Sequence, residues 1–340
     1  MKQTETHACL LSVIVPVYNL EAYVGACLRS LSVQGLAQTE YEILCVNDGS
    51  TDGSSAIIRQ MAQTYPYIRL IEQQNQGVSV ARNTGLSQAR GEYVLFCDGD
   101  DFLEPYCLKR AVMLLKERGA VSASFGFRVV EETAEVSVET AEDVALTVCT
   151  GRSKPFYSGN IWRFILRRDF LNDYQIRFKP GMRYAEDELF LYHVCRHLDF
   201  RQHIYISDVV YNYRMRATSA VHTQRAIRLK AHYADMVSMA LEYKPYRTDK
   251  TLSAPMRRST RVRYQYAVSN ALQDALLLGE RSPREVLAEL REKGLYPYGL
   301  MWGLLKPKHP KTMLVNYMKL LYTVPLYYIG IYKLRHLQKK

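Results

Sequence analysis

The stretch that decides the fold is GEYVLFCDGDDF, residues Gly91–Phe102. Its apolar residues Val94–Cys97 indicate a buried strand, and they run directly into Asp98, Asp100 and Asp101. Three carboxylates within four positions repel one another unless solvent or a cation takes up their charge. A solvated turn is one interpretation, because Asp and Gly are common turn residues. The other is a metal site at the carboxyl end of a buried strand.

Strand and helix patterns alternate over the first hundred residues. Short β-branched or aromatic runs predict four strands, and apolar residues at helical spacing predict a helix after each of the first three. This alternation implies a parallel sheet, in which ligands bind beyond the carboxyl ends of the strands. The predicted strands are LLSVIVPVY, YEILCVN, YIRLIEQ and YVLFC, and the predicted helices are EAYVGACLRSL, SSAIIRQMAQTY and VSVARNTGLSQA.

Polar turns follow all four predicted strands. They are Tyr18-Asn19, Asp48–Asp52, Asn75–Gly77 and the Asp98–Asp101 cluster. Because the carboxyl ends of parallel strands meet at one edge of a sheet, we expect these turns to converge on one crevice.

The second part of the chain has a mixed pattern. The acidic stretch EETAEVSVET predicts an exposed hairpin or loop, and YSGNIWRFILRRDFL predicts a helix with Trp162 in its apolar portion. In GMRYAEDELFLYHVCRHL, the acids 186–188 open an apolar helix, where negative charge complements the helix dipole. Residues 224–300 are helical in pattern, and Ser282 and Glu285 predict a capping box at a helix start, with Pro283 as the first helical residue and Gly294 after the end.

Length and cysteine content limit the protein class. The 340 residues suffice for one large domain or two ordinary ones. The seven cysteines are scattered, without a C-x-x-C pair, which suits a reducing cytoplasm better than a disulfide framework. The apolar run 8–17 contains Pro16 and no small-residue cleavage site, so we expect a first strand and not an export signal.

The positive charge is concentrated at the end of the chain. Residues 301–340 contain eight Lys or Arg and no Asp or Glu, and so carry +8 of the formal +11. Lys319 and Pro325 argue against a transmembrane helix within TMLVNYMKLLYTVPLYYIG. Tyrosines and Trp302 beside lysines are typical of an interfacial helix on an anionic membrane. The alternative is a helix packed on the rest of the protein, with a solvated basic face.

Five motifs carry a resemblance to a known family. In order and spacing, the chain from about residue 10 to 215 resembles family-2 glycosyltransferases, inverting enzymes with the GT-A fold, of the kind that build bacterial polysaccharide and lipopolysaccharide. Each motif alone is weak, and five in register favour the family strongly. The motifs are PVYN (Pro16–Asn19), VNDGSTDGS (Val46–Ser54), NQGVSVARNTGL (Asn75–Leu86), DGDD (Asp98–Asp101) and AEDELF (Ala185–Phe190).

The resemblance implies an α/β protein: a GT-A fold with a Rossmann-like, mostly parallel sheet flanked by helices, and a helical C-terminal extension. We expect a catalytic domain over residues 1–220, with a nucleotide-binding half up to about 102 and an acceptor-binding half over 103–220. A helical extension over 221–300 and a basic, membrane-associating tail over 301–340 would follow.

A divalent cation, Mn²⁺ or Mg²⁺, is part of what the resemblance implies. It acts as a Lewis acid on the leaving diphosphate of a sugar nucleotide. Asp100 is expected to hold the cation directly, and Asp98 to contact the ribose or a metal-bound water. Gly99 would remove a side chain where the diphosphate approaches the backbone, and His222 is the candidate third ligand.

The resemblance also implies a nucleotide site. Asp48 is expected to accept the N3–H of uracil, although it could instead cap a turn or a helix; Asp52 is evenly balanced between the two roles. Arg82 is expected to reach the nucleotide or its phosphate, with a surface arginine as the alternative. The other expected contacts are Pro16, Val17, Tyr18 and Asn19 around the uridine, Glu21 near the ribose or base, and Arg214 and Ser219 on the diphosphate, whereas Arg216 is expected at the surface.

Asp187 is the candidate general base. In an inverting transfer the acceptor hydroxyl attacks in a single displacement and needs a carboxylate within hydrogen-bond reach, with a somewhat raised pKa. The family's catalytic acidic motif falls on Glu186 and Asp187, and Glu188 is the competing choice.

The predicted protein is therefore a hexosyl- or N-acetylhexosaminyltransferase that moves one sugar from a UDP-sugar to a saccharide acceptor, expected to be lipid-linked, on the cytoplasmic face of the cell membrane. The Q-x-x-R-W motif of processive synthases is absent. A nucleotidyltransferase is an alternative, but PVYNLEAYV offers no Gly-rich phosphate loop. A non-enzymatic basic protein is another, but its clustered acids would repel nucleic acid, so we expect no nucleic-acid partner.

Overall fold

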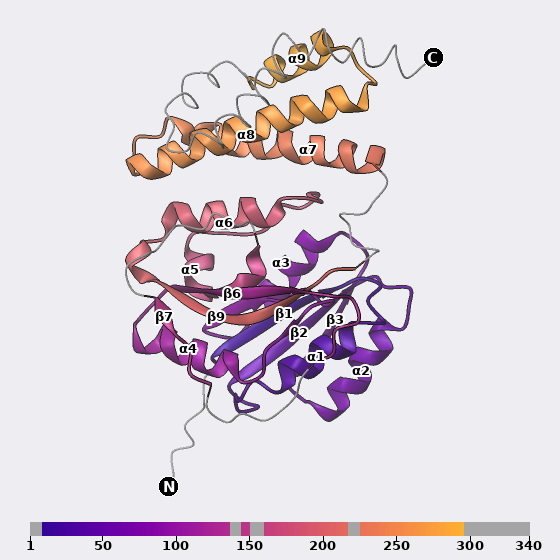
Figure 1. Ribbon diagram of the computed structural model, residues 1–340, viewed down its shortest axis with the longest axis vertical. Helices are drawn as coiled ribbons and strands as arrows, with labels where there is room; N and C mark the ends of the chain where they lie inside the picture. The colour runs from indigo at the N-terminus through magenta and orange to yellow at the C-terminus, as the bar shows by residue number, and fades with distance from the viewer. Residues whose placement is uncertain (1–8, 137–143, 150–159, 217–224, 296–340) are drawn as a thin grey trace. The chain divides into compact units, whose positions relative to one another are not determined.

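The computed structural model describes residues 9–136, 144–149, 160–216 and 225–295. The chain divides into two compact units, residues 1–222 and 223–340, which are described separately (Figure 1).

The described strands of the first unit form one nine-stranded sheet. Its order is β3-β2-β1-β4-β8-β6-β9-β5, and β7 pairs with β9. The four strands of the first hundred residues are parallel, as the sequence predicts, whereas β8 runs antiparallel to both β4 and β6. The strands are β1 (Leu11–Val17), β2 (Tyr41–Asp48), β3 (Ile68–Gln73), β4 (Tyr93–Phe96), β5 (Phe102–Leu103), β6 (Ser122–Val130), β7 (Val148–Cys149), β8 (Phe164–Arg167) and β9 (His203–Arg214).

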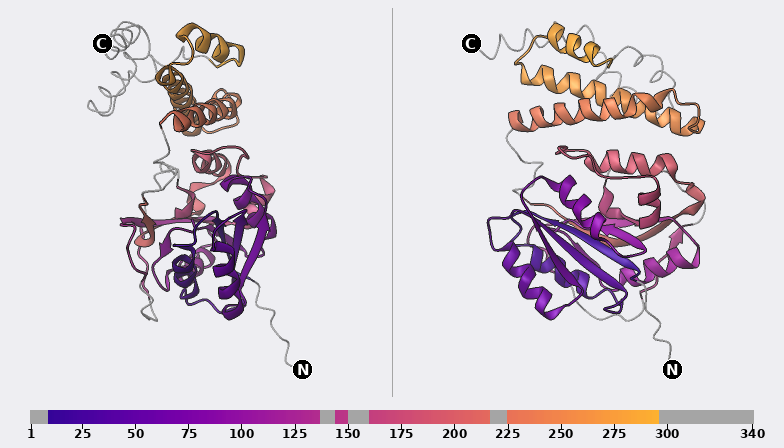
Figure 2. Two further views of the ribbon diagram at one scale, coloured as in Figure 1. Left: turned by 90° about the vertical axis from the view of Figure 1, so that its right-hand side faces the viewer. Right: turned by 180° about the vertical axis from the view of Figure 1, so that it is seen from behind.

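Helices cover both faces of this sheet, as Figures 1 and 2 show. Successive side chains of a strand point to opposite faces, so Val13 and Val15 face one core and Ile14 faces the other. Helices α1, α2 and α4 pack on the first face, and α3, α5 and α6 on the second. The helices are α1 (Val24–Ser32), α2 (Ser54–Thr64), α3 (Val78–Gln88), α4 (Cys107–Glu117), α5 (Arg168–Asp173) and α6 (Glu186–His197). The mixed α/β fold confirms the predicted fold class.

The helix predicted for YSGNIWRFILRRDFL is wrong. Its described part is a short 3-10 turn η1 (Ile161–Arg163), strand β8 and helix α5. The four residues FILR lie in the slot between β4 and β6, where Phe164, Ile165 and Leu166 are all buried, so sheet pairing outweighs the helical periodicity. Trp162 does lie in the core, 4% exposed.

The acidic stretch predicted as an exposed hairpin or loop is described only up to residue 136. That part, residues 131–136, contains a turn and no strand. The rest of the stretch lies outside the described residues.

The second unit is helical in its described part, as predicted. Helices α7 (Arg225–Tyr243) and α8 (Ala254–Leu278) pack against each other, followed by α9 (Pro283–Glu292). The predicted capping box is present, because Ser282 and Glu285 bond each other's backbone N–H groups. Gly294 follows the helix with φ 65°, a left-handed conformation that glycine adopts without strain.

Among the described helices, none combines the length and apolar content that a bilayer crossing requires. The basic tail, residues 301–340, lies outside the described part of the chain.

Candidate active site

The D-G-D-D turn lies at the carboxyl end of β4, beside the end of β1. A Cβ atom on Gly99 would lie 2.9 Å from Leu20 Cδ1 and 3.1 Å from the Pro16 carbonyl oxygen. The protein's own packing therefore disfavours a side chain at this position, in addition to any approach of a diphosphate.

Arg82 of α3 lies at the centre of the acidic residues. Its side chain is 3% exposed, and its Nη2 bonds Asp98 Oδ1 at 2.8 Å. Its Nη1 bonds Glu186 Oε1 at 2.9 Å and Asp187 Oδ1 at 2.7 Å. The guanidinium also lies 5.1 Å from the centre of the Phe178 ring. The Arg82 guanidinium thus joins the D-G-D-D turn to the start of α6.

These contacts rule out the alternative that Arg82 is a surface arginine, because its side chain is buried and both Nη atoms contact carboxylates. Its contact with the nucleotide or its phosphate stays a prediction.

Asp187 is held on both of its carboxylate oxygens. Arg82 contacts Oδ1, and the backbone N–H of Ile161 donates to Oδ2 at 3.1 Å. Burial raises the pKa of Asp187 to about 8, with the nearby charges of Glu186 and Asp98 adding to the rise and Arg82 opposing it. Of the three consecutive acids, Glu186 and Asp187 contact Arg82.

The residue before this pair has an unusual backbone. Ala185 has φ 59°, a left-handed conformation that non-glycine residues adopt rarely. Strained backbone of this kind clusters at functional sites. It turns the chain sharply into α6, so that the acids of the first helical turn reach Arg82.

Asp101 is the most deeply buried acid of the turn. Tyr211 of β9 donates its hydroxyl to Asp101 Oδ2 at 2.7 Å, and the backbone N–H of Arg214 donates to Oδ1 at 2.7 Å. The same Tyr211 hydroxyl accepts from the backbone N–H of Asp98 at 3.1 Å. Asp101 therefore anchors the turn to β9.

The predicted contact of Arg214 with a diphosphate stays a prediction, and the structure gives its side chain a role within the protein. Its side chain is buried, and its guanidinium donates to three backbone carbonyl oxygens, those of Asp100, Glu132 and Ala134. These bonds make Arg214 a structural brace for the turn.

The prediction that Arg216 is a surface residue is also wrong. Its Nη2 lies 2.6 Å from Asp100 Oδ2, with the two side chains 17% and 19% exposed. Arg216 lies two residues beyond Arg214, the last residue of β9, and the local sequence pattern does not indicate its contact with Asp100.

Asp48 has the capping role that the sequence left as the alternative. Its Oδ1 accepts from Gln73 Nε2 at 2.7 Å and from the backbone N–H of Gln76 at 2.9 Å, and its Oδ2 accepts from Gly77 N–H at 2.8 Å. These bonds fix the turn that leads into α3. A carboxylate has about four acceptor positions, so one further donor fits.

The two loops predicted to surround the uridine bind each other. The backbone N–H of Thr51 donates to Asn19 Oδ1 at 2.8 Å, and that of Gly53 donates to Glu21 Oε2 at 2.9 Å. Asp52 Oδ2 accepts in return from the backbone N–H of Glu21 at 2.9 Å. The side chains of Asn19 and Glu21 are thus engaged in shaping the loops.

The remaining predicted residues have contrasting environments. Pro16 and Val17 end β1, with Val17 buried, while the side chain of Tyr18 is 50% exposed. Ser219 and His222 lie outside the described residues.

The donor set fits a divalent cation. Five carboxyl groups and three guanidinium groups meet around the turn, which leaves a formal excess of two negative charges. Burial, followed by the charges of neighbouring aspartates, raises the pKa of Asp100 and Asp101, as expected where negative charge is undercompensated. The groups are Asp98, Asp100, Asp101, Glu186 and Asp187, with Arg82, Arg214 and Arg216.

No three acidic, His or Cys groups of the described residues are arranged to hold a metal by themselves. A cation bound by one or two carboxylates would take its other ligands from a diphosphate and water, which is the usual arrangement for Mg²⁺ in nucleotide sites.

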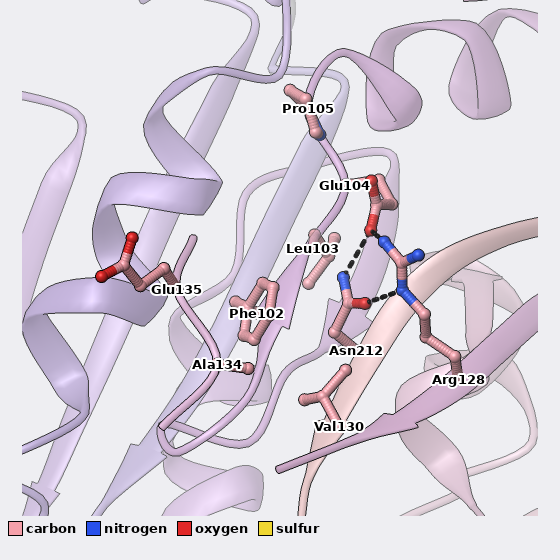
Figure 3. Close-up of a pocket in the computed structure, with 9 residues that line it drawn as sticks. All are labelled: Phe102, Leu103, Glu104, Pro105, Arg128, Val130, Ala134, Glu135 and Asn212. Atoms are coloured by element: carbon pink, nitrogen blue, oxygen red, sulfur yellow. Dashed lines mark hydrogen bonds and ion pairs between the residues drawn. The ribbon is translucent and has the colours of Figure 1, made fainter. Parts of the chain in front are cut away.

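A small pocket of about 270 Å³ is lined by residues 102–105, which follow the turn, and by residues of β6 and β9 (Figure 3). At its rim, Asn212 and Arg128 bond Glu104 and each other. Asn212 lies between Tyr211 and Tyr213, whose side chains point to the opposite face of the sheet. The pocket is therefore on the other side of β9 from Tyr211. None of the predicted site residues lines it.

Comparison with solved structures defines the class of the fold. The chain is similar to residues 1–349 of TarS from Staphylococcus aureus, solved in complex with UDP-GlcNAc, with a TM-score of 0.60 and 21% identity. The match covers 85% of this chain and 89% of that one. The architecture is thus that of the GT-A glycosyltransferases.

Sequence comparison gives the family. Glycosyl transferase family 2 matches residues 12–180. The chain is 30% identical over 263 residues to the uncharacterized glycosyltransferase YibD of Escherichia coli (strain K12), covering 72% of this chain and 74% of that protein. It is 29% identical over 218 residues to the putative glycosyltransferase EpsH of Bacillus subtilis (strain 168), covering 62% of each. The chain belongs to glycosyl transferase family 2. This supports a glycosyltransferase over the nucleotidyltransferase and the non-enzymatic basic protein.

Proposed function

We propose that the protein transfers one sugar from a UDP-sugar to a hydroxyl of a saccharide acceptor, with inversion at the anomeric carbon and with Asp187 as general base. The observation that carries the proposal is the cluster on Arg82. It brings Asp98 of the D-G-D-D turn and Asp187 of α6, 89 positions apart in the sequence, onto one guanidinium group.

Asp187 has the properties of a general base. A pKa of about 8 lets its carboxylate take a proton from a hydroxyl more readily than an ordinary aspartate. The Ile161 N–H and Arg82 fix the orientation of the carboxylate. The acceptor hydroxyl would bind within hydrogen-bond reach of Asp187 and pass its proton there as it attacks the sugar.

The donor would bind across the carboxyl ends of β1, β2 and β4. UDP is the proposed nucleotide, supported by the family resemblance and by the UDP-GlcNAc bound to the structural neighbour TarS. The backbone of residues 16–19 and one remaining acceptor position of Asp48 would hold the uridine. Asp98, fixed by Arg82, would lie at the ribose or at a metal-bound water.

Asp100, with Asp98 beside it, would hold Mn²⁺ or Mg²⁺. A cation bound there neutralises charge on the leaving diphosphate. The protein's contribution is to hold the two carboxylates on a glycine turn braced by Arg214 and Tyr211.

The proposed acceptor is a lipid-linked saccharide, and the proposed location is the cytoplasmic face of the cell membrane. Support comes from the basic, tyrosine-rich sequence of residues 301–340 and from the family's role in cell-surface polysaccharides.

The test of the proposed function is Asp187→Asn, which keeps the size of the side chain and removes the base. We expect transfer to fall by about 10²-fold to 10⁴-fold, with UDP affinity unchanged. Sugar transfer would be assayed over a panel of nucleotide sugars, and UDP binding by calorimetry. Glu188→Gln is the matched control and should retain most activity. A loss of tenfold or less in Asp187→Asn would disqualify Asp187 as the base.

A further inference from the structure

Arg216 binds the same residue that the proposed function assigns to the cation. The Arg216–Asp100 ion pair is short, at 2.6 Å, and largely shielded from water. The guanidinium also lies 5.1 Å from the centre of the Tyr23 ring, which gives it a second favourable contact. Asp100 therefore already has a positive partner before any ligand binds.

A divalent cation and this guanidinium compete for Asp100. Two positive groups on one carboxylate oxygen repel each other, and the repulsion is strong where water is excluded. Binding of a cation by Asp100 Oδ2 thus weakens the contact with Arg216 and favours its movement away.

Arg216 retains an unused donor. Its Nε is buried and, like the Nε of Arg82, has no acceptor within the described part of the chain. Buried donors without partners are rare in native proteins and call for an explanation. A ligand with several acceptor oxygens, such as a diphosphate, would satisfy it.

The two neighbouring arginines differ from Arg216 in the number of acceptors that their guanidinium groups contact. Arg82 is committed to three carboxylates and Arg214 to three backbone carbonyl oxygens, and both are more deeply buried. The described contacts of the Arg216 side chain are one carboxylate, that of Asp100, and the Tyr23 ring.

We infer that Arg216 is the resting counter-ion of Asp100 and moves from Asp100 to the diphosphate when the nucleotide and the cation bind. This inference rests on the proposed function. It makes Arg216 a positioning residue that keeps Asp100 occupied in the free protein. The cation then binds weakly alone and more tightly together with the nucleotide, and by linkage each ligand raises the affinity of the other.

The test is Arg216→Gln, measured by direct binding. Titration of Mn²⁺ by electron paramagnetic resonance, without nucleotide and in mildly alkaline buffer, should show tighter binding than in the wild type, by at least about fivefold. Titration of UDP at saturating Mn²⁺ should show weaker binding by a similar factor, because a phosphate contact is lost. These opposite changes distinguish the inference from a purely structural role, which would weaken both.

Three variants complete the experiment. Arg216→Lys should restore weak Mn²⁺ binding, since it keeps the charge. Asp100→Asn should abolish the gain in the double variant with Arg216→Gln. Arg110→Gln removes an arginine from the exposed pair with Glu117 on α4 and should change neither titration.

The outcomes separate the inference from the proposed function. If the wild type binds Mn²⁺ and UDP but Arg216→Gln leaves Mn²⁺ affinity unchanged or lower, with its thermal unfolding intact, the inference is overturned and the function stands. If the wild type binds neither UDP nor Mn²⁺, both are overturned.

Discussion

At the scale of single residues, the unusual feature is one guanidinium shared by three carboxylates. Arg82 is almost completely buried, so its charge is stabilised by Asp98, Glu186 and Asp187 rather than by water. Removing one partner of a buried ion pair is far more costly than removing an exposed pair. Arg82 thus connects stability and catalysis in one side chain.

Arg82→Met should destabilise the first unit by about 3–5 kcal/mol, because three half-buried carboxylates lose their buried counter-ion. The stability of Arg82→Lys should lie between those of the wild type and Arg82→Met, since lysine keeps the charge and loses the planar fork of donors. Urea unfolding measures both. Arg59→Met, which breaks the exposed pair with Glu72, is the control and should change stability by about 1 kcal/mol or less. Equal effects at the two positions would contradict the role of Arg82.

The pH dependence of the reaction should follow Asp187. A general base acts only in its ionised form, and burial raises the pKa of Asp187 to about 8. We expect kcat/KM for the free enzyme to rise tenfold per pH unit up to about pH 8 and to level off above it. Bound cation would move this limb to lower pH, so the profile is measured at several Mn²⁺ concentrations. A rate that is independent of pH between 6 and 8 at low Mn²⁺ would contradict the assignment.

Residue identities were easier to predict than contacts. The motifs placed Asp98 and Asp100 at the end of β4 and Asp187 at the start of α6, because strand and helix patterns locate such residues along the chain. The partners of Arg82 come from positions 98, 186 and 187, and local pattern carries no information on which distant acid an arginine meets. For the same reason, the sequence did not indicate that Arg216 pairs with Asp100 or that Arg214 binds three backbone carbonyl oxygens.

At the scale of elements, the two halves of the sheet differ in how far the sequence determines them. The parallel strands β1 to β4 are apolar runs with helices between them, and the prediction for all four is confirmed. Strand β8 has four residues whose apolar pattern also fits a helix, and its state is decided by pairing with β4 and β6. Short elements of this kind depend on tertiary context more than on propensity.

His203 should make the β6–β9 pairing sensitive to acid. Its two ring nitrogens bond the hydroxyls of Ser122 and Ser124, and burial lowers the pKa of His203 from 6.5 to about 4. The unfolded chain therefore binds a proton that the folded chain does not between these pH values, so stability is full above pH 6.5 and falls as the pH drops towards 4.

This prediction is measured by urea unfolding at a series of pH values. In His203→Gln, the loss of stability between pH 6.5 and 4 should be smaller than in the wild type. Parallel curves for the two proteins would show that His203 does not contribute to the acid sensitivity.

At the scale of the whole molecule, charge is distributed unevenly. Acids gather at the carboxyl edge of the sheet, whereas residues 301–340 hold most of the formal excess of positive charge. The amino edge of the sheet contains an acid that is buried without an excess of negative charge around it. There Glu42 is almost fully buried and is paired with Arg69 and Arg90 and bonded by Ser12. Glu42 thus has two cations for one carboxylate, whereas the cluster around the D-G-D-D turn has three guanidinium groups for five carboxyl groups.

Deletion of residues 301–340 should move the protein from the membrane pellet to the supernatant. Each lysine or arginine near an anionic surface contributes roughly 1 kcal/mol, so loss of eight cations removes most of the attraction. Sedimentation with vesicles of phosphatidylglycerol, against phosphatidylcholine vesicles as control, measures the change. An unchanged distribution would favour a tail that packs on the rest of the protein.

The shared guanidinium of Arg82 also has a consequence for how such a protein changes over generations. A substitution that neutralises Glu186 leaves two acids against one cation, and a substitution of Arg82 leaves three acids without any. Neither change is neutral by itself, so these four positions are expected to vary together or not at all. Asp98 on the donor side and Glu186 and Asp187 on the acceptor side would then change together during evolution, although they lie far apart in the sequence.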